Sequence, residues 1–252
     1  MGQETVNIIQ VQNLSKSYKG KLEPVLNSLN LKVPKGEFYG ILGPNGAGKT
    51  SLMNILCGLI KANAGSVSVL NANPITFSNL DKVGIGVVPQ DIALYDKLSG
   101  RENLLFFGNA YRIPPKILKQ KIDEYTKIFG LEHAMDRPLG TYSGGMKRRV
   151  NLMAGILHDP EILFLDEPTV GIDVQSRHKI IDFLKDYNAS GKTIFYTSHH
   201  MREAETLCTL VGIMDAGTLV AEGTPKELMS TYNCESLEDV FLNITGKQLR
   251  DE

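Results

Sequence analysis

The segment Tyr142–Gly171, YSGGMKRRVNLMAGILHDPEILFLDEPTVG, sets a Ser-Gly-Gly turn a short distance before an apolar run that ends in two acids. The apolar run, Ile162–Leu165, predicts a buried strand, which leaves Asp166 and Glu167 at the end of that strand. One carboxylate at such a place can hold a magnesium ion, and the next can act on water. The alternative is a strand-end pair that forms a turn and caps a helix.

A glycine-rich loop lies upstream, at Gly43–Thr50 (GPNGAGKT), and fits the pattern G-x-x-x-x-G-K-[ST]. It follows an apolar strand pattern and opens a helix, so its backbone N–H groups are expected to turn inward around phosphate oxygens. Lys49 is then expected to reach the β and γ phosphates, and the Thr50 hydroxyl to ligate magnesium. Ser51 is expected on the helix surface or as a secondary phosphate contact. A plain turn is the alternative for the loop as a whole.

The Ser-Gly-Gly turn is a second place where a phosphate can bind. Ser143 is a good N-cap for the helix that follows, and Gly144 and Gly145 leave backbone amides uncovered. The next residues, Lys147–Arg149, place cations in the first turns, where the helix dipole favours acids by roughly 0.3–1 kcal/mol each. That arrangement favours an anionic guest nearby, and a solvated basic face is the alternative.

Composition limits the class of protein. The chain has 252 residues, 42% of them hydrophobic, which is enough for one α/β domain with subdomains. Its 27 Lys and Arg residues against 28 acids give no overall basic excess of the kind that marks a nucleic-acid binder. The three cysteines are odd in number and lack metal-site spacing, so we expect structural thiols in a reducing compartment.

No apolar segment approaches the length that spans a bilayer, and the start MGQETVN lacks the apolar core of a signal peptide. We therefore expect a chain that is soluble by itself. If it acts at a membrane, it must dock on another protein that supplies the passage.

Strand and helix patterns alternate along the chain, which predicts an α/β fold. Between roughly residues 91 and 159 the pattern is helical, with a capping box formed by Ser99 and Glu102. The predicted strands are Val6–Val11, Gly36–Leu42, Ser66–Leu70, Val83–Val88, Ile162–Leu165 and Thr193–Thr197, with a hairpin over Leu210–Val220. The predicted helices include Lys49–Leu59, Asn103–Arg112, Val174–Tyr187 and Met201–Leu207.

The order of these motifs resembles that of the ATP-binding subunit of an ABC transporter over nearly the whole chain. In that family Gly43–Thr50 corresponds to the Walker A loop, Ile162–Asp166 to Walker B, and Tyr142–Met146 to the signature motif. One triphosphate needs only one phosphate loop, so a second phosphate-binding turn in one chain calls for a reason. The family's head-to-tail dimer supplies it, because each signature lies against the ATP held by the other subunit.

The resemblance also implies a fold and its divisions. The fold is an α/β P-loop NTPase (RecA-like) core with an antiparallel β subdomain and an inserted α-helical subdomain, all within one ATP-binding domain over residues 1–252. The core and β subdomain would cover about 1–90 and 160–235, and the helical subdomain with the signature about 91–159. A C-terminal helix and tail would cover about 236–252.

Four further positions match the family residue by residue. Tyr18 resembles the aromatic that stacks on adenine, with an ordinary surface tyrosine as the alternative. Gln90 resembles the glutamine that senses magnesium and the attacking water and couples to the membrane partner, with a polar loop residue as the alternative. His199 resembles the histidine that contacts the γ phosphate, and His200 beside it is its rival. Asp173 resembles the dimer-contact loop, and it can equally be the N-cap of the next helix.

The signature departs from the usual LSGGQ, with Tyr142 in place of leucine and Met146 in place of glutamine. Ser143-Gly144-Gly145 is kept, so phosphate capture is expected to survive. Together with the segment Ser236–Leu242, SLEDVFL, this variant resembles the branch that serves multidrug and related ABC-2-type exporters.

The resemblance thus implies an ATPase that uses ATP and Mg²⁺, closes as a homodimer or as a heterodimer with a second ATPase subunit, and powers export through an integral-membrane permease. It would be cytoplasmic and peripheral on the inner face of the cell membrane, and no nucleic acid is expected as a partner. The alternatives are a soluble ABC-type ATPase that acts on nucleic acid or ribosomes, and a small-molecule kinase with a phosphate loop. A kinase would leave Ser143–Gly145 and His199 without a role.

The residues that this interpretation assigns fall into three groups. The catalytic group is Lys49, Gln90, Glu167 and His199. The magnesium group is Thr50, Gln90 and Asp166. The nucleotide group is Tyr18, Gly43, Pro44, Asn45, Gly46, Ala47, Gly48, Lys49, Thr50, Ser51, Ser143, Gly144 and Gly145.

Overall fold

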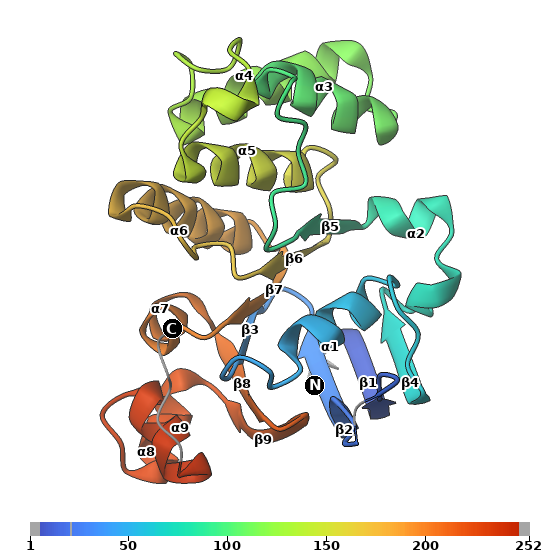
Figure 1. Cartoon of the computed structure of the whole chain (residues 1–252), viewed down its shortest axis with the longest axis vertical. Helices are drawn as coiled ribbons and strands as arrows, with labels where there is room; N and C mark the ends of the chain where they lie inside the picture. The colour runs from blue at the N-terminus through green and yellow to red at the C-terminus, as the bar shows by residue number, and fades with distance from the viewer. Residues whose placement is uncertain (1–5, 21, 247–252) are drawn as a thin grey trace, which may run out of the picture. The chain divides into compact units, whose positions relative to one another are not determined.

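The computed structural model describes residues 6–20 and 22–246 and divides the chain into two compact units. The first unit is formed by Met1–Lys82 together with Lys192–Glu252, and the second by Val83–Gly191 (Figure 1). Across the described ranges, none of the helices has both the length and the apolar character needed to cross a bilayer.

An antiparallel three-stranded sheet lies in the first unit. Its middle strand is β1 (Asn7–Lys16), flanked by β2 (Leu26–Pro34) and β4 (Ala64–Val69). Strand β2 is absent from the strands predicted from the sequence. The register explains why: Leu14 pairs with Leu29 and Lys16 with Leu26, so β2 carries one extra residue there and the alternation of apolar and polar residues breaks.

A second set of strands in the first unit is parallel and buried. Strand β3 (Phe38–Leu42) lies between β7 (Thr193–Ser198) and β8 (Leu210–Asp215) and is parallel to both, and β9 (Thr218–Gly223) closes a hairpin with β8. Every residue of β3 and β7 is buried, as in a sheet covered on both faces.

The helices of the first unit are short. Helix α1 (Lys49–Leu56) follows β3, and α7 (Met201–Leu207) begins at the residue that the sequence predicts. Helix α8 (Pro225–Tyr232) packs beside α9 (Leu237–Thr245), as Figure 1 shows. The minor elements are η1 (Pro74–Thr76) and α2 (Asn79–Val83), which leads into the second unit.

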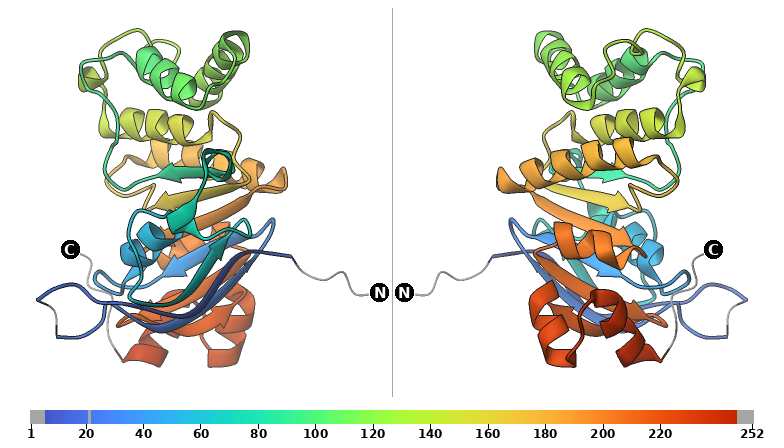
Figure 2. Two further views of the ribbon diagram at one scale, coloured as in Figure 1. Left: turned by 90° about the vertical axis from the view of Figure 1, so that its right-hand side faces the viewer. Right: turned by 90° about the vertical axis from the view of Figure 1, so that its left-hand side faces the viewer.

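The second unit is mostly helical. Its strands β5 (Ile85–Val88) and β6 (Ile162–Asp166) pair in parallel. Helix α5 (Gly144–Ile156) packs against α3 (Gly100–Ala110), α4 (Pro115–Phe129) and α6 (Val174–Ala189), and in both views of Figure 2 it lies between α6 and the α3–α4 pair. A short 3₁₀ turn, η2 (Leu139–Thr141), precedes α5. The capping box predicted for α3 is present, with Ser99 N donating to Glu102 at 2.7 Å and Glu102 N donating to Ser99 Oγ at 3.1 Å.

Candidate functional site

The glycine loop joins β3 to α1 in the first unit, as predicted. Gly48 has a left-handed backbone, with φ of 103°, and a Cβ there would lie 2.7 Å from the Val25 carbonyl oxygen. Only glycine fits both conditions. Within the described chain α1 has neither a side-chain cap nor an acid in its first turn, so its first N–H groups and positive end face the loop.

Lys49 lies inside this loop. Its side chain is buried, and its Nζ donates to the carbonyl oxygens of Gly43 at 2.7 Å and Pro44 at 3.1 Å. Asn45 and Gly46 are exposed, whereas Ala47 is buried and its carbonyl accepts from Gly217 N at 3.1 Å. The loop is therefore anchored on its inner side and open on its outer side.

Tyr18 lies at the first turn of α1. Its hydroxyl is 3.2 Å from Ser51 Oγ, one residue beyond the exposed Thr50. The Lys16 ammonium lies 5.2 Å from the centroid of the tyrosine ring and is held there by the Lys61 carbonyl at 2.6 Å. The ring is thus fixed from two sides and remains 38% exposed.

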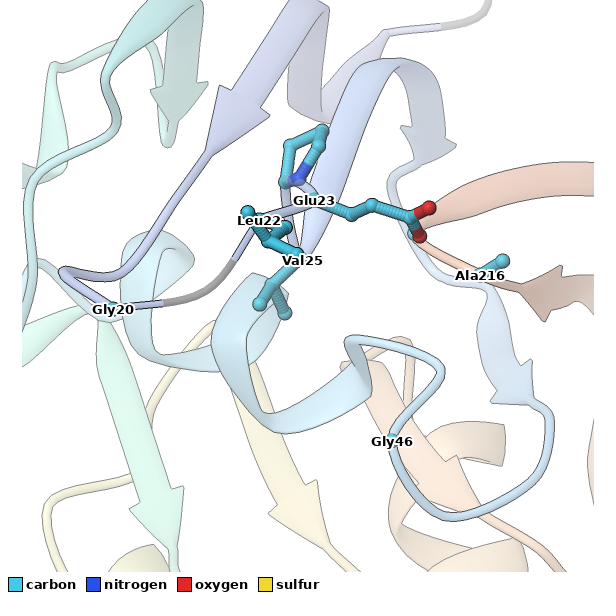
Figure 3. A pocket seen from close by; sticks show the side chains of 8 residues that line it. Gly20, Leu22, Glu23, Val25, Gly46 and Ala216 are labelled. Carbon is cyan, nitrogen blue, oxygen red and sulfur yellow. The ribbon is translucent and has the colours of Figure 1, made fainter.

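An open hollow of about 420 Å³ adjoins the loop (Figure 3). Leu22, Glu23 and Val25 from the β1–β2 connection line one side, and Gly46 of the loop and Ala216 of the β8–β9 turn line the other. Glu23 places an acid beside the loop, and Leu22 is fully exposed. The hollow gives the outer side of the loop room for a ligand.

Strand register places His199 at the edge where this loop begins. Leu42 of β3 pairs with Ser198 of β7, so Gly43 and His199 leave the same end of two parallel strands. His200 follows as the N-cap residue of α7, and its N–H donates to Ser198 Oγ at 2.9 Å. The two histidine rings lie 4.1 Å apart, centroid to centroid.

In the second unit, the register of β5 and β6 places Gln90 and the two acids at the same end of the paired strands. Val88 of β5 pairs with Leu165 of β6, so Gln90 emerges beside Asp166 and Glu167. Gln90 is exposed, whereas both acids are buried. Glu167 also has a positive φ of 47°, a conformation that side chains other than glycine adopt at a cost of about 1–3 kcal/mol and that clusters at functional sites.

Arg148 is a residue of this region that the sequence analysis did not assign to the site. It is 6% exposed, and its Nη1 donates to the Pro89 carbonyl at 3.0 Å, directly before Gln90. Burial lowers the pKa of Arg148, and the charges of Asp91, Asp166 and Glu167, in that order, oppose the shift. Among the described atoms its Nε has no hydrogen-bond partner. A buried cation therefore ties α5 to the segment that carries Gln90.

The Ser-Gly-Gly turn has the predicted cap. Met146 N donates to Ser143 Oγ at 3.3 Å, and both Ser143 and Gly144 are exposed. Gly145 is buried, and a Cβ there would lie 2.3 Å from Ser176 Oγ and 2.7 Å from Asp173 Oδ2. At the N-terminal end of α5, Gly144 is therefore exposed on the surface, whereas the next residue, Gly145, packs against α6.

The cations after the turn have partners within the chain, and the anionic guest expected near this run stays a prediction. Lys147 pairs with Asp96 at 2.7 Å, and Arg149 donates to the carbonyls of Phe129 at 2.6 Å and Gly145 at 3.2 Å. Arg149 and Arg148 are both buried, so the alternative of a solvated basic face is wrong for these two residues. These side chains satisfy backbone carbonyls and one acid instead.

Tyr142, which replaces the usual leucine of the signature, is buried, and its hydroxyl donates to the Ala134 carbonyl at 2.5 Å. A Cβ on Gly100 would lie only 2.6 Å from the Tyr142 hydroxyl oxygen. The tyrosine therefore fits at this position because residue 100, in α3, is a glycine. The tyrosine thereby fastens the turn to the chain that precedes it.

Asp173 is the N-cap of α6, as one of its two predicted roles requires. Its carboxylate accepts from Ser176 N at 2.9 Å and from Ser176 Oγ at 2.7 Å. These bonds, led by the backbone one, lower the pKa of Asp173, with a minor contribution from the charge of Arg149. The dimer-contact role stays a prediction.

The structure thus gathers the predicted residues in two groups. The first unit holds Tyr18, the glycine loop and His199, and the second holds Gln90, Asp166, Glu167 and the Ser-Gly-Gly turn. Within the described part of the chain, no group of three His, Cys, Asp or Glu side chains is arranged to hold a metal by itself. Any divalent ion here would need hydroxyl, amide or phosphate oxygens as well.

Comparisons with known proteins agree with this picture. A family model described as ABC transporter matches residues 26–170. The chain is 38% identical over 239 residues to the linearmycin resistance ATP-binding protein LnrL of Bacillus subtilis (strain 168), covering 95% of this chain and 76% of that protein. It is 38% identical over 231 residues to the Nod factor export ATP-binding protein I of Rhizobium meliloti, covering 91% and 68%. It is also similar in structure to a dimeric ATP-binding cassette in a post-hydrolysis state bound to ADP and Pi, with a TM-score of 0.77, 27% identity, and 86% and 98% of the two chains covered.

Proposed function

This chain belongs to the ABC transporter family as one of its ATP-binding domains, and we propose that it drives export through a separate integral-membrane permease. It is an ATPase with the α/β P-loop NTPase fold. The names of its relatives, which refer to linearmycin resistance and to Nod factor export, support the export direction and do not favour work on nucleic acid.

The observation that carries the proposal is the exposed Ser143–Gly144 end of α5 in a chain that already has a complete phosphate loop at Gly43–Thr50. One nucleotide needs one such loop. We therefore propose that two copies close head to tail around two ATP molecules, so that Ser143–Gly145 of each chain contacts the ATP held by the other. A second, different ATPase subunit can take the place of the second copy.

Within one site, each residue has a proposed role. Tyr18 stacks on adenine with the ring face that Lys16 leaves uncovered. Lys49 binds the β and γ phosphates, and His199 contacts the γ phosphate. Glu167 orients and polarises the attacking water, and Gln90 senses that water.

The oxygen donors of Thr50, Gln90 and Asp166 fit a hard cation, and Mg²⁺ is the ion we assign to them. Bound there, it would neutralise charge that develops on the phosphates. Asp166 is buried at the end of β6, which supplies the water-poor surroundings in which such a carboxylate acts strongly.

The second unit also offers a surface for the permease. Tyr95, Leu105 and Phe106 are exposed to 51%, 37% and 48%, and the rings of Tyr95 and Phe106 meet edge to face at 5.1 Å. Exposed aromatic clusters of this kind mark protein contacts. Coupling would run through this helical region, about residues 91–159, and the stretch after Gln90. The chain would then work peripherally on the cytoplasmic face of the membrane.

The substitution Glu167→Gln tests the proposal. The variant should keep ATP, lose most hydrolysis and accumulate a dimer in ATP, because the amide cannot polarise water while the phosphate contacts stay intact. Size-exclusion chromatography with and without ATP measures the dimer. A variant that binds ATP and stays strictly monomeric would refute the shared site.

A further inference from the structure

A groove lies between α4 and α6 in the second unit, and none of its lining residues is among those assigned above to ATP binding or hydrolysis. It has a volume of about 420 Å³, in the range of small-ligand and side-chain pockets. Its lining, which we call the α4–α6 groove, is Glu124, Tyr125, Ile128, Lys179, Asp182, Phe183, Asp186, Tyr187 and Ser190.

The floor of the groove is aromatic. Phe183 stacks on Tyr187 with ring centroids 5.6 Å apart, and Tyr125 meets Phe183 edge to face at 6.1 Å. Phe129 supports Phe183 from below at 4.8 Å. Ile128 stands beside this cluster and is 47% exposed. The floor is therefore apolar, closely packed and open to a partner.

The rim of the groove is acidic. Glu124, Asp182 and Asp186 are all exposed, and among the described residues none of the three forms a salt bridge. Asp182 and Asp186 stand one helical turn apart, a like-charge pair that disfavours the isolated helix. Among the described residues that line the groove, Lys179 is the one cation. Its ammonium lies against Gly130, so close that a Cβ on this glycine would be 2.4 Å from Nζ.

Aromatic faces next to unpaired carboxylates attract a cation that also has an apolar stem. The charges of the rim acid Glu124 and of Asp159 also act on the aromatic floor: besides burial, both raise the pKa of Tyr125, and Asp159 does the same for Tyr187. Arginine and lysine side chains carry both a cation and an apolar stem.

We infer that the α4–α6 groove is a docking site for an arginine- or lysine-bearing amphipathic segment of the permease's cytoplasmic side. The inference rests on the proposed function, which supplies the permease as the partner. Cytoplasmic segments of membrane proteins carry an excess of Lys and Arg, so they offer the cation that the acidic rim attracts. The occupant's cation pairs with Asp182 and Asp186, and its apolar residues cover Ile128 and Phe183.

A peptide-binding measurement tests the groove without the permease. The probe is a synthetic amphipathic peptide with leucine on one face and arginine on the other, labelled with fluorescein and followed by anisotropy. Asp182→Asn/Asp186→Asn should weaken its binding by about tenfold or more, since two close ion pairs are lost. The control Glu132→Gln/Glu235→Gln removes the same charge from exposed positions outside the groove and should change binding less than about twofold.

The same peptide with glutamate in place of arginine should not bind. Equal affinity of the wild type and Asp182→Asn/Asp186→Asn for the arginine peptide would overturn the inference. The inference would also fail if the small cation agmatine bound as tightly as the peptide, because the groove would then be a site for small cations and not for a peptide segment. Thermal unfolding of the variant should occur at a temperature no lower than that of the wild type, because both acids are exposed and unpaired among the described residues and their mutual repulsion is removed.

Native membranes separate this inference from the proposed function. Wild type and control should stay on membranes of the producing cell up to a higher salt concentration than Asp182→Asn/Asp186→Asn, because the variant keeps only the contacts at Tyr95, Leu105 and Phe106; ATPase activity of the free chain should be unchanged. Release of all three proteins at the same salt concentration would refute the groove as a permease contact. Release of the wild type before any salt is added would refute the permease, and with it the assigned occupant, whatever the peptide does.

Discussion

The guanidinium of Arg148 donates from Nη1 to the Pro89 carbonyl at 3.0 Å, and this bond links the helix that starts at the Ser-Gly-Gly turn to the residue before Gln90. Asn151, one turn further along α5, donates to the same carbonyl at 3.3 Å. We therefore expect a movement of α5 to reach Gln90 through this one acceptor. Arg148 is a positioning residue, because its described contact is with the backbone.

We predict that Arg148→Met lowers kcat by about tenfold or more while KM for ATP changes little, since Gln90 loses its position but Lys49 keeps its own. Stability should fall by no more than about 1–3 kcal/mol, because one hydrogen bond from a charged donor is lost while Asn151 still donates to the Pro89 carbonyl. Steady-state ATPase kinetics and urea unfolding measure the two effects.

Lys147→Met is the matched control, because it removes the neighbouring charge from a partly exposed pair with Asp96. Such pairs contribute at most about 1 kcal/mol, so its kcat should stay near the wild-type value. Arg148→Lys should recover only part of kcat, because an ammonium lacks the planar fork of a guanidinium. If Lys147→Met lost as much kcat as Arg148→Met, or if both variants changed KM for ATP as much as kcat, the positioning role would be contradicted.

The adjacent glycines of the turn give a second prediction. Gly145→Ala should destabilise the second unit by about 1–3 kcal/mol, because its methyl would lie 2.3 Å from Ser176 Oγ. Gly144→Ala should fold normally, since its methyl would meet only the Gly171 carbonyl, at 3.8 Å. Thermal melts of both proteins check this prediction. Equal melting temperatures would show that α6 moves away from the added methyl without loss of stability.

How much of this could be predicted from the sequence depends on the range of the signal. The phosphate loop, the strand-end acids and the caps at Ser99, Ser143 and Asp173 depend on residues a few positions apart, so local spacing predicts them. The cap of α8 is equally local, since Thr224 and Glu227 form a capping box, and it was overlooked.

The remaining features depend on partners far along the chain. Strand β2 escaped because an extra residue near Ser28, which has a φ of 45°, breaks the period of two. Arg148 escaped because its acceptor, Pro89, is fifty-nine residues away and nothing local shows that a cation in a basic run is buried. The partners of Lys147 and Arg149, namely Asp96 and the Phe129 carbonyl, could not be predicted for the same reason.

A mixing experiment tests whether sites are shared between chains. Ser143→Arg blocks the turn that a partner's ATP needs, and Lys49→Ala removes the ammonium that binds the phosphates in its own loop, so each protein alone should lack ATPase activity. A mixed dimer retains one site with an intact loop from the first protein and an intact turn from the second. Its activity should exceed that of either parent, measured by phosphate release. Activity no higher than the parents' would argue against shared sites.

Tyr125 allows a prediction for alkaline pH. Burial first, then the charges of Asp159 and Glu124, raises its pKa from 10.0 to about 12. A group with a raised pKa in the folded state stabilises the protein fully below its unfolded pKa and loses that contribution as pH rises through the folded pKa. The contribution of the neutral tyrosine should therefore fall between about pH 10 and pH 12.

Tyr125→Phe keeps the ring against Phe183 and removes the titrating hydroxyl. Other buried tyrosines, such as Tyr39 and Tyr196, also have raised pKa values, so both proteins should lose stability in alkali. The informative quantity is the difference in unfolding free energy between wild type and variant, from urea melts at a series of pH values. That difference should be constant below pH 10 and then shift in favour of the variant, because only the wild type has this hydroxyl to ionise on unfolding. Parallel curves across the whole window would mean that Tyr125 ionises as readily in the folded groove as in the unfolded chain.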